Sequence, residues 1–254
     1  MITIRKARPG EGVVVAQRIR ESLPPSIDGL TIWHCPRVDR WVEMHLVTPG
    51  STAFYLAVDE RDQAVAAAEF RIVKSTAFLN QIGVTPSGQG KGIGGRLLAT
   101  GLHELSQRKG VVSLALDVET ANERASAWYR RLGLSPVSRT YWTLTPLRPD
   151  GASPAPVHGW EEAEREQARY GFSRFQVHGN IGPFDVGRLG DSLFRLTSDA
   201  AWRDSAVHAA LDRVDTTRRL LLIRESQIAD LRPVRHTERL TGPINPILAK
   251  LPTP

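Results

Sequence analysis

The chain has 254 residues, 41% hydrophobic and 24% charged, enough for one large domain or two smaller ones with apolar cores. Its net charge of +6 suits an anionic ligand, whereas the lack of a long basic run makes nucleic-acid binding a weak alternative. The single cysteine, Cys35, cannot form an internal disulfide, which is typical of cytoplasmic proteins. No apolar run approaches the roughly 18 residues of a membrane span, so we expect a cytoplasmic protein without a membrane anchor.

The first part of the chain alternates strands and helices. Hydrophobic spacing predicts a strand over 1–8, a helix over Glu11–Leu23, a helix near Arg37–Leu46, and strands over Thr52–Val58, Ala64–Val73 and Ala77–Val84. It then predicts a helix that ends at Gly110, a strand over Val112–Val118, a helix that carries Tyr129, and a closing strand over Val137–Leu144. Thr120 and Glu123 would form a capping box for the helix that carries Tyr129.

The most informative segment is the turn between the predicted strand Ala77–Val84 and the helix that follows it. Gly90, Gly92, Gly94 and Gly95 leave backbone N–H groups without Cβ cover where the helix begins. Such a turn can bind a phosphate, because free amides and the positive helix end both attract anions, and Lys91 adds charge. Each glycine destabilises the helix by roughly 1 kcal/mol relative to alanine, so a purely structural role explains them poorly.

Two other phosphate-binding patterns fit this turn less well. A Walker loop needs Ser or Thr after its lysine, but Gly92 follows Lys91. A Rossmann dinucleotide fingerprint is matched literally by residues 90–95, with Asp117 about where a ribose-binding acid belongs. Its first glycine should follow the strand directly, however, and residues 85–89 intervene. The Rossmann interpretation therefore stays open as the weaker alternative.

A third pattern fits better. Gln89-x-x-Gly92-x-Gly94 resembles the pyrophosphate loop of the GNAT acetyltransferase superfamily, and Val84-Thr-Pro86 resembles the strand end that precedes that loop. The resemblance covers residues 1–147. It implies a GNAT-type fold of the α/β class, in which helices flank a mixed central sheet.

The second mark of that superfamily follows one helix and one strand later. Asn122 stands before a helix that carries Tyr129 and ends at Leu-Gly-Leu. Leu134 takes the place of the aromatic residue that is usual there. Either motif alone is weak, but the two in this order are a specific signal.

The resemblance implies that acetyl-CoA is the acyl donor and that it binds where two parallel strands, 77–84 and 112–118, splay apart. Backbone groups of one strand would bond the pantetheine arm as an added strand does. The turn would bind the pyrophosphate, and Asn122 would bond the arm from the other side. The residues implied for this coenzyme are Ile82, Gly83, Val84, Gln89, Gly90, Lys91, Gly92, Ile93, Gly94, Gly95 and Asn122.

Two side chains are candidates for proton transfer. The phenol of Tyr129, with an ordinary pKa of about 10, could protonate the departing thiolate, or it could be a packed aromatic. An amine acceptor must lose a proton before it attacks, and Glu69, an acid in an apolar strand, is the first candidate base. An ion pair with Arg71 is the alternative for Glu69, and Glu119 is a second candidate base. No Cys/His cluster has zinc spacing, so we expect no metal.

A stretch rich in turn formers, residues 146–156, marks the expected domain boundary. We expect a GNAT domain over 1–147, a linker over 148–156 and a smaller α+β domain over 157–254, to which we assign no chemistry. In the second domain the pattern predicts helices over Trp160–Arg169 and Asp199–Val214, and strands over Phe172–Val177, Phe184–Leu189, Ser192–Leu196 and Arg218–Arg224. Residues 232–237 faintly echo residues 135–140, which hints at a decayed repeat.

Together these patterns predict an N-acetyltransferase that transfers acetyl from acetyl-CoA directly to a primary amine of a small molecule or peptide. A non-catalytic acyl-CoA-binding regulatory module is the second interpretation. The sequence leaves open the acceptor, the acyl chain length and whether the chain forms a homodimer.

Overall fold

The computed structural model describes residues 1–48, 50–108, 110–229 and 231–253. Within these residues no helix is long and apolar enough to cross a membrane. The chain divides into two compact units, each built from separate stretches of sequence. Unit 1 comprises Met1–Pro24, Asp39–Ser138 and Thr237–Pro254, and unit 2 comprises Pro25–Val38 and Arg139–His236.

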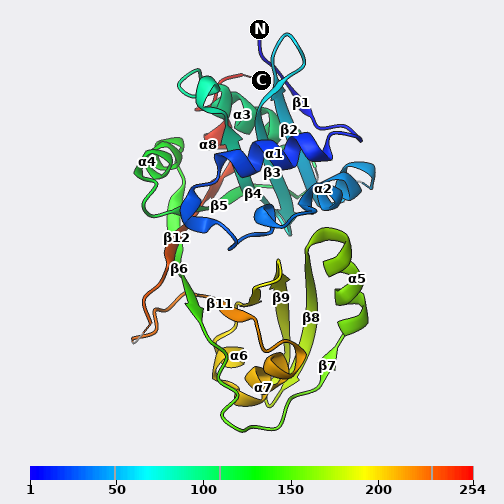
Figure 1. Cartoon of the computed structure of the whole chain (residues 1–254). Coiled ribbons are helices and arrows are strands. Elements are labelled where there is room, and N and C mark those ends of the chain that lie inside the picture. The colour runs from blue at the N-terminus through cyan, green and yellow to red at the C-terminus, as the bar shows by residue number, and fades with distance from the viewer. Residues whose placement is uncertain (49, 109, 230, 254) are drawn as a thin grey trace. The chain divides into compact units, whose positions relative to one another are not determined.

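Unit 1 is built on a mixed sheet (Figure 1). Its strands in spatial order are β1 (Thr3–Lys6), β2 (Thr52–Val58), β3 (Ala64–Val73), β4 (Thr76–Val84), β5 (Ser113–Glu119) and β12 (Arg235–Pro243). Neighbouring strands are antiparallel except for β4 and β5, which are parallel. The mixed sheet confirms the predicted fold class. It also excludes the doubly wound parallel sheet that the Rossmann interpretation requires.

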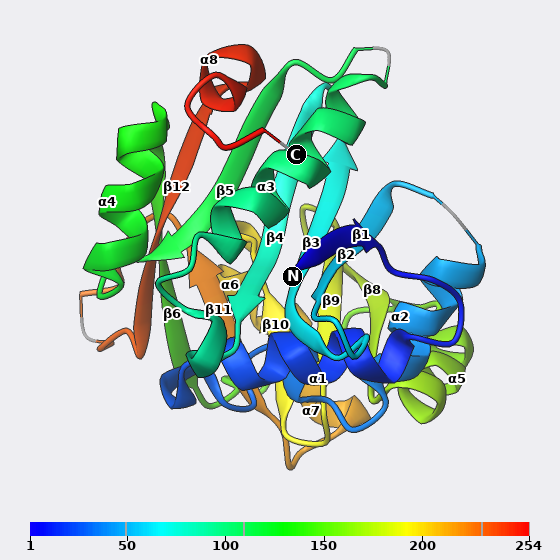
Figure 2. The same ribbon diagram turned by 90° about the horizontal axis from the view of Figure 1, so that it is seen from above.

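Helices cover both faces of this sheet (Figure 2). On one face lie α1 (Gly12–Ser22) and α2 (Val38–Val47), and on the other lie α3 (Ile93–Ser106), α4 (Glu123–Leu132) and α8 (Ile244–Leu248). The larger apolar core of unit 1 lies on the α3 side, where the sheet packs against α3, α4 and α8. The two motifs of the sequence therefore lie on one face, at the beginnings of α3 and α4.

Strand β3 shows how the sequence assigns side chains to the two faces. Ala66, Ala68 and Phe70 belong to the core on the α3 side, so Glu69 points to the α1 side. The ring of Phe70 reaches Gly101 of α3, where an added Cβ would lie 2.4 Å from Phe70 Cε2. Helix α3 can approach the sheet this closely because residue 101 has no side chain.

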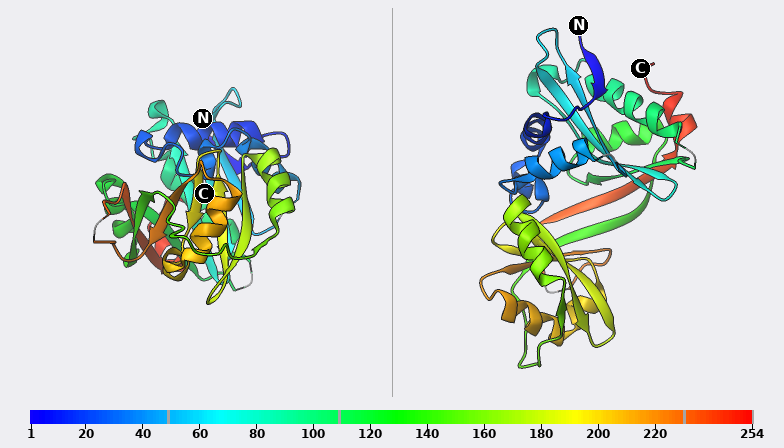
Figure 3. Two further views of the ribbon diagram at one scale, coloured as in Figure 1. Left: turned by 60° about the horizontal axis from the view of Figure 1, so that its bottom comes forward. Right: turned by 90° about the vertical axis from the view of Figure 1, so that its right-hand side faces the viewer.

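Unit 2 repeats the strand order of unit 1. An antiparallel series of β7 (Val157–His158), β8 (Phe172–Gly179), β9 (Gly182–Leu189) and β10 (Leu193–Leu196) is followed by β11 (Arg219–Arg224), parallel to β10, and by β6 (Ser135–Thr145), antiparallel to β11. Its helices are α5 (Trp160–Tyr170), α6 (Asp199–Arg203) and α7 (Ser205–Val214), with short 3₁₀ helices at Pro25–Ile27 and Ile32–His34. Helices α5 and α7 cover the same apolar face (Figure 3). The repeat of topology extends far beyond the faint echo in the sequence.

The structure divides the chain differently from the expected domains 1–147 and 157–254. Strand β12 pairs with β5 from Thr237↔Glu119 to Pro243↔Ser113, so the end of the chain belongs to unit 1. The expected closing strand, Val137–Leu144, is part of β6 and pairs with β11 in unit 2. The expected linker, 148–156, also lies within unit 2. A hydrophobic pattern indicates a strand but not the strand with which it pairs, so these long-range pairings could not be predicted.

Two predicted helix beginnings also differ from the structure. The N-cap of α4 is Asn122 rather than Thr120, because Asn122 Oδ1 accepts a hydrogen bond from Ala125 N–H at 3.1 Å. The predicted helix Asp199–Val214 is two helices, because Asp204 ends α6 and caps α7. In both places an Asn or Asp side chain accepts a hydrogen bond from a backbone N–H group and so fixes the residue at which the helix begins.

The contact between Phe70 and Gly101 gives a stability prediction. Gly101→Val should lower the free energy of unfolding by about 1–3 kcal/mol, because the new methyl groups would overlap a buried ring. His103→Val, on the exposed side of the same helix, is the matched control and should stay within about 0.5 kcal/mol. Urea unfolding measures both variants, and equal midpoints would mean that α3 does not approach the sheet in this way.

Candidate functional site

The glycine-rich turn leads from β4 into the first turn of α3. A 3₁₀ helix, Pro86–Gly88, follows β4, and α3 begins at Ile93 with Gly92 as its N-cap. Gly90 and Gly92 have φ of +77° and +70°, which residues with a Cβ rarely adopt. Among the described residues, no heavy atom lies within 4 Å of the position that a Cβ would take at either glycine. The turn is therefore built around open space.

The backbone N–H groups of the turn form two sets. Those of Gly88 and Gln89 donate to the carbonyl of Thr85 at 2.9 and 3.1 Å and close the 3₁₀ turn. Those of residues 90–95 make no hydrogen bond of normal geometry in the part of the chain that the structure describes, and Arg96 N–H then begins the regular helical pattern. A row of unbonded donors at the positive end of a helix attracts an anion.

The side chains of the turn divide between binding the protein and facing solvent. Arg96 turns away from the turn, because its Nη2 donates to the carbonyl of Ile2 at 2.9 Å. The Nε2 of Gln89 donates to the carbonyl of Val84 at 3.3 Å. Since the N–H of Gln89 is also bonded within the turn, the structure does not leave that predicted donor available. Lys91 is exposed and supplies positive charge at the turn itself.

Strands β4 and β5 stay paired only over their first halves. Their register runs from Thr76↔Ser113 to Leu79↔Leu116 and extends no further among the described residues. Beyond that point, within the residues that the structure describes, β4 pairs only with β3, and β5 only with β12. The facing edges of the two strands are open after Leu79 and Leu116, as the resemblance implied. This opening is called the fork below.

A β-bulge lies at the start of the fork. Glu69 of β3 faces Gln81, and Phe70 faces Leu79, so Asn80 is the extra residue of β4. A bulge bends its strand and increases the local twist. The bulge thus accounts for the turning of β4 away from β5 at this residue.

The backbone of Ile82, Gly83 and Val84 forms the β4 side of the fork. Thr85 N–H donates to Val65 O, so Gly83, two residues before it, is hydrogen-bonded to Ala67 of β3 in the same way. The backbone groups of Ile82 and Val84, which alternate with Gly83, therefore point into the fork. Gly83 also meets a close approach of α1, since an added Cβ would lie 2.1 Å from Ser22 Oγ. An extended ligand could bond this edge as a further strand.

Two pairs of polar side chains lie at the start of the fork on the α1 side. Asn80 Nδ2 donates to Oε2 of Glu69. Across the fork, Arg239 of β12 donates to both carboxylate oxygens of Asp117 at 2.8 Å, and its guanidinium lies 5.1 Å from the ring centre of Phe78. Asn80 and Arg239 could not be predicted from the sequence, because a bulge has no local signal and Arg239 lies 122 residues from its partner.

Glu69 is fully buried on the α1 side of the sheet. Its cross-strand partner Phe54 lies on the same side and contacts Trp41 of α2 edge-on, with 6.1 Å between ring centres. Arg71 Nη2 lies 3.3 Å from Glu69 Oε1, so the ion pair considered from the sequence forms. Burial raises the pKa of Glu69 above its ordinary value, although Arg71 and Asn80 oppose the rise. The carboxylate is a strong proton acceptor for its type, but both its oxygens are engaged.

Tyr129 belongs to α4 and lies on the α3 side. Asn122 caps the start of α4, and Gly133, with φ of +104°, ends it. The side chain of Tyr129 is 6% exposed and belongs to the same apolar core as Leu79 and Leu116. Burial raises the pKa of this phenol above its ordinary value, so it keeps its proton at neutral pH. In the described part of the chain its hydroxyl makes no hydrogen bond, so the proton is available to a ligand.

The structure does not bring Glu69 and Tyr129 together on one face. Glu69 points to the α1 side and Tyr129 packs on the α3 side. The fork is the place where the sheet between these two faces is open. Asn122 follows β5 on the other side of the fork, and its Oδ1 is engaged with Ala125, so its Nδ2 is the group left for a ligand.

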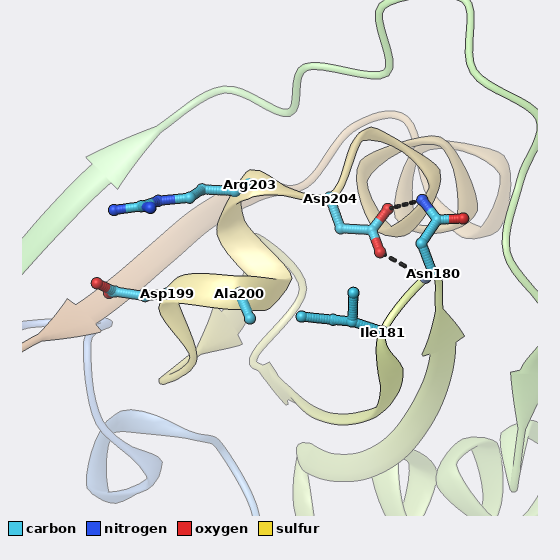
Figure 4. Close-up of a pocket in the computed structure, with 6 residues that line it drawn as sticks. All are labelled: Asn180, Ile181, Asp199, Ala200, Arg203 and Asp204. Carbon is cyan, nitrogen blue, oxygen red and sulfur yellow. Dashed lines mark hydrogen bonds between the residues drawn. The ribbon is translucent and has the colours of Figure 1, made fainter.

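Unit 2 contains an open hollow of about 470 Å³ lined by Asn180, Ile181, Asp199, Ala200, Arg203 and Asp204 (Figure 4). Asp204 accepts hydrogen bonds from the backbone N–H and the Nδ2 of Asn180 at 2.6 and 2.8 Å. Asp199 accepts from the side chain of Arg224. Both carboxylates of the hollow, Asp199 and Asp204, are therefore engaged in hydrogen bonds within the chain. Among the described residues no group of three or more His, Cys, Asp or Glu could hold a metal ion.

Comparison with known proteins gives a sequence match whose residues belong mostly to unit 1. Residues 18–134 match the family model described as Acetyltransferase (GNAT) family. The mycothiol acetyltransferase of Mycolicibacterium gilvum (strain PYR-GCK) is 36% identical over 91 residues, which are 34% of this chain and 30% of that protein. The chain therefore matches less than a third of the length of that curated relative.

Solved structures share the fold of the whole chain. A tandem GNAT protein from the clavulanic acid biosynthesis pathway matches with a TM-score of 0.67 and 12% identity, over 96% of this chain and 99% of that one. A GCN5-related N-acetyltransferase from Sphaerobacter thermophilus matches with a TM-score of 0.61 and 13% identity, over 96% of each chain. The region matched by the family model includes the glycine-rich turn, the fork, Glu69 and Tyr129. Residues 18–134 therefore match an acetyltransferase domain of the GNAT family.

Proposed function

We propose that the chain is an acyl-CoA-dependent N-acetyltransferase, which transfers the acetyl group of acetyl-CoA to a primary amine by direct attack while both are bound. The observation that carries this proposal is the row of unbonded N–H groups at residues 90–95, which follows directly on the open edge of the fork. A diphosphate attached to an extended, amide-bearing arm is the ligand chemistry that these two features would bind together.

The residues present fit that coenzyme. The N–H groups of residues 90–95 would bond the diphosphate oxygens, in the open space beside Gly90 and Gly92. The backbone edge of residues 82–84 would bond the pantetheine amides, and Asn122 Nδ2 would bond the arm from the β5 side. Acetyl-CoA would supply the acetyl group as a thioester, which an amine can attack.

Proton transfer would occur on the two faces of the sheet. Tyr129, on the α3 side, would donate its phenolic proton to the sulfur as the carbon–sulfur bond breaks. Glu69, on the α1 side, would take the proton that the amine loses, through water because the carboxylate is buried. Its raised pKa favours this role, since a carboxylate that resists ionisation holds a proton more strongly.

The acceptor would approach from the α1 side of the fork. Asp117 and Glu69 lie there, but Arg239 and Arg71 pair with them, so the charge of this region gives no preference for a cationic acceptor. The primary amine of a small molecule or peptide is the proposed acceptor. The name of the Mycolicibacterium relative supports acetyl transfer as the reaction class. Because the match covers 30% of that protein, it does not identify the acceptor of this chain.

A second candidate is a non-catalytic module that binds acyl-CoA and regulates a partner. The burial of Glu69, with both oxygens bonded to Arg71 and Asn80, favours it, since an engaged base is a poor one. A panel of primary amines, with free thiol release from acetyl-CoA as the readout, separates the two. We expect release with at least one amine and none with its tertiary analogue. Tight acetyl-CoA binding with background release for every amine would favour the module.

The phosphate-binding role of the turn is tested by Gly92→Val. A branched side chain would project into the open space at the turn and should abolish acetyl-CoA binding measured by calorimetry. The matched control is Gly110→Val, which strains a similar backbone, with φ of +86°, at the far end of α3. If Gly92→Val binds acetyl-CoA as tightly as the wild type, the turn is not the diphosphate site.

The role of Tyr129 is tested by Tyr129→Phe. Turnover should fall by about tenfold or more, because the acid is lost, while acetyl-CoA affinity stays nearly unchanged, because the ring still packs. Tyr170→Phe removes another buried tyrosine hydroxyl, in unit 2, and should leave turnover unaltered. Since burial raises the pKa of Tyr129, the wild-type rate should show no loss from its ionisation up to about pH 9. Wild-type turnover in Tyr129→Phe would remove this residue from the mechanism.

The role of Glu69 is tested by Glu69→Gln. A carboxyl whose pKa is raised by folding stabilises the fold less as pH rises from its ordinary pKa to its folded value. The variant should therefore gain stability over the wild type as pH increases through that window, and show no gain below it. Turnover should fall, whereas Glu119→Gln, which tests the second candidate base, should keep it. Loss of turnover only in Glu119→Gln would transfer the role to Glu119.

A further inference from the structure

The last described residues, 250–253, are called the C-terminal tail here. Figure 2 shows the end of the chain beside α3. At one end, Lys250 Nζ donates to the carbonyl of Arg131 in the last turn of α4 at 3.2 Å. At the other, Pro252 lies against Gly95, where an added Cβ would be 3.7 Å from Pro252 Cδ. Gly95 is one of the residues whose N–H makes no hydrogen bond of normal geometry in the described chain. The tail thus connects α4 to the turn that carries the proposed function.

The core of unit 1 fixes the position of the tail. Ile244 and Ile247 of α8 are buried, and Leu251 packs on the same core. The N–H groups of Lys250 and Leu251 donate to the carbonyls of Ile247 and Leu248 at 3.0 and 3.1 Å. The exposed Pro252 therefore follows directly on an anchored segment, and its place beside α3 is set by packing.

The tail lies on one particular flank of α3. Ile93 and Leu97 face the core, and Arg96 faces the start of the chain, where it bonds the carbonyl of Ile2. Gly95 lies two residues after Ile93, about half a turn away from it around the helix axis. Gly95 lies on the flank of α3 that faces the tail. The first turn of α3 is therefore bounded by the tail near Gly95 and by the start of the chain near Arg96.

We propose that the C-terminal tail forms the outer wall of the coenzyme site and that Pro252 contacts the nucleotide half of bound acetyl-CoA. The inference rests on the proposed function, because it requires the diphosphate at residues 90–95. A diphosphate on these amides lies next to the proline ring at Gly95. Because the acetyl and pantetheine part points back into the fork, the nucleotide is the part that must leave past the tail.

The chemistry of Pro252 suits this position. Proline has no N–H, so it adds no donor that would compete for the diphosphate. Its ring offers an apolar, stiff surface for the ribose or the base. Lys250, bonded at the end of α4, brings a positive charge to the same tail. A change in the tail should therefore alter the binding only of ligands that carry the nucleotide.

The first test is protection of a cysteine placed in the tail of the full chain. Cys35 is buried, so the variants Pro252→Cys and Pro246→Cys each present one accessible thiol to a maleimide. At acetyl-CoA ten times its Kd, labelling of Pro252→Cys should slow about tenfold, because about a tenth of the chains stay free. Labelling of Pro246→Cys, exposed on α8, should not change. Adenosine 3′,5′-diphosphate should protect Pro252→Cys, and acetyl-pantetheine should not.

The second test compares affinities by calorimetry. Pro252→Gly should weaken acetyl-CoA binding about fivefold and acetyl-pantetheine binding by less than about twofold, with Pro246→Gly as the control. Equal weakening of both ligands, tighter acetyl-CoA binding, or unchanged labelling at saturation would each overturn the inference. If the wild type itself binds no acetyl-CoA, the proposed function fails with it; if the wild type binds and the variants behave alike, only the inference about the tail fails.

Discussion

The extra residue Asn80 in β4 opens the fork between β4 and β5, on which the proposed coenzyme site depends. Two parallel strands are normally hydrogen-bonded along their shared length. Here the pairing of β4 with β5 stops at Leu79 and Leu116. Glu69 holds Asn80 from the neighbouring strand and is itself fully buried. Because the bulge is held by the chain's own groups, the fork exists in the protein without a ligand.

The fork and the glycine-rich turn follow each other in sequence and present one continuous surface of backbone groups. The strand edge offers alternating donors and acceptors, and the turn offers donors alone. The positive φ angles of Gly90 and Gly92 let the chain turn sharply into α3 without side chains in the way. A ligand with an amide-bearing arm and an anionic group would match these two parts in order. Backbone geometry, more than any side chain, therefore defines the proposed coenzyme site.

The parts of this account that the sequence predicted are local ones. The turn, its helix and the helix of Tyr129 lie within short motifs, and Glu69 with Arg71 pairs because residues two apart share a strand face. The parts that it did not predict depend on strand register or on contacts between distant segments. The bulge at Asn80, the pairing of β12 with β5, the bond from Arg239 to Asp117 and the approach of Pro252 to Gly95 are of this kind. Unit 2 repeats the strand topology of unit 1, but the sequence shows only a faint similarity, between residues 232–237 and 135–140.

The N–H groups of residues 90–95 should be unbonded until a diphosphate binds them. Amide hydrogen exchange of the full chain, followed by NMR with and without acetyl-CoA, tests this expectation most directly. These amides should exchange rapidly in the free chain and become strongly protected at saturating acetyl-CoA, while Gly88, bonded to Thr85, changes little. Protection already present in the free chain, or none at saturation, would contradict the account.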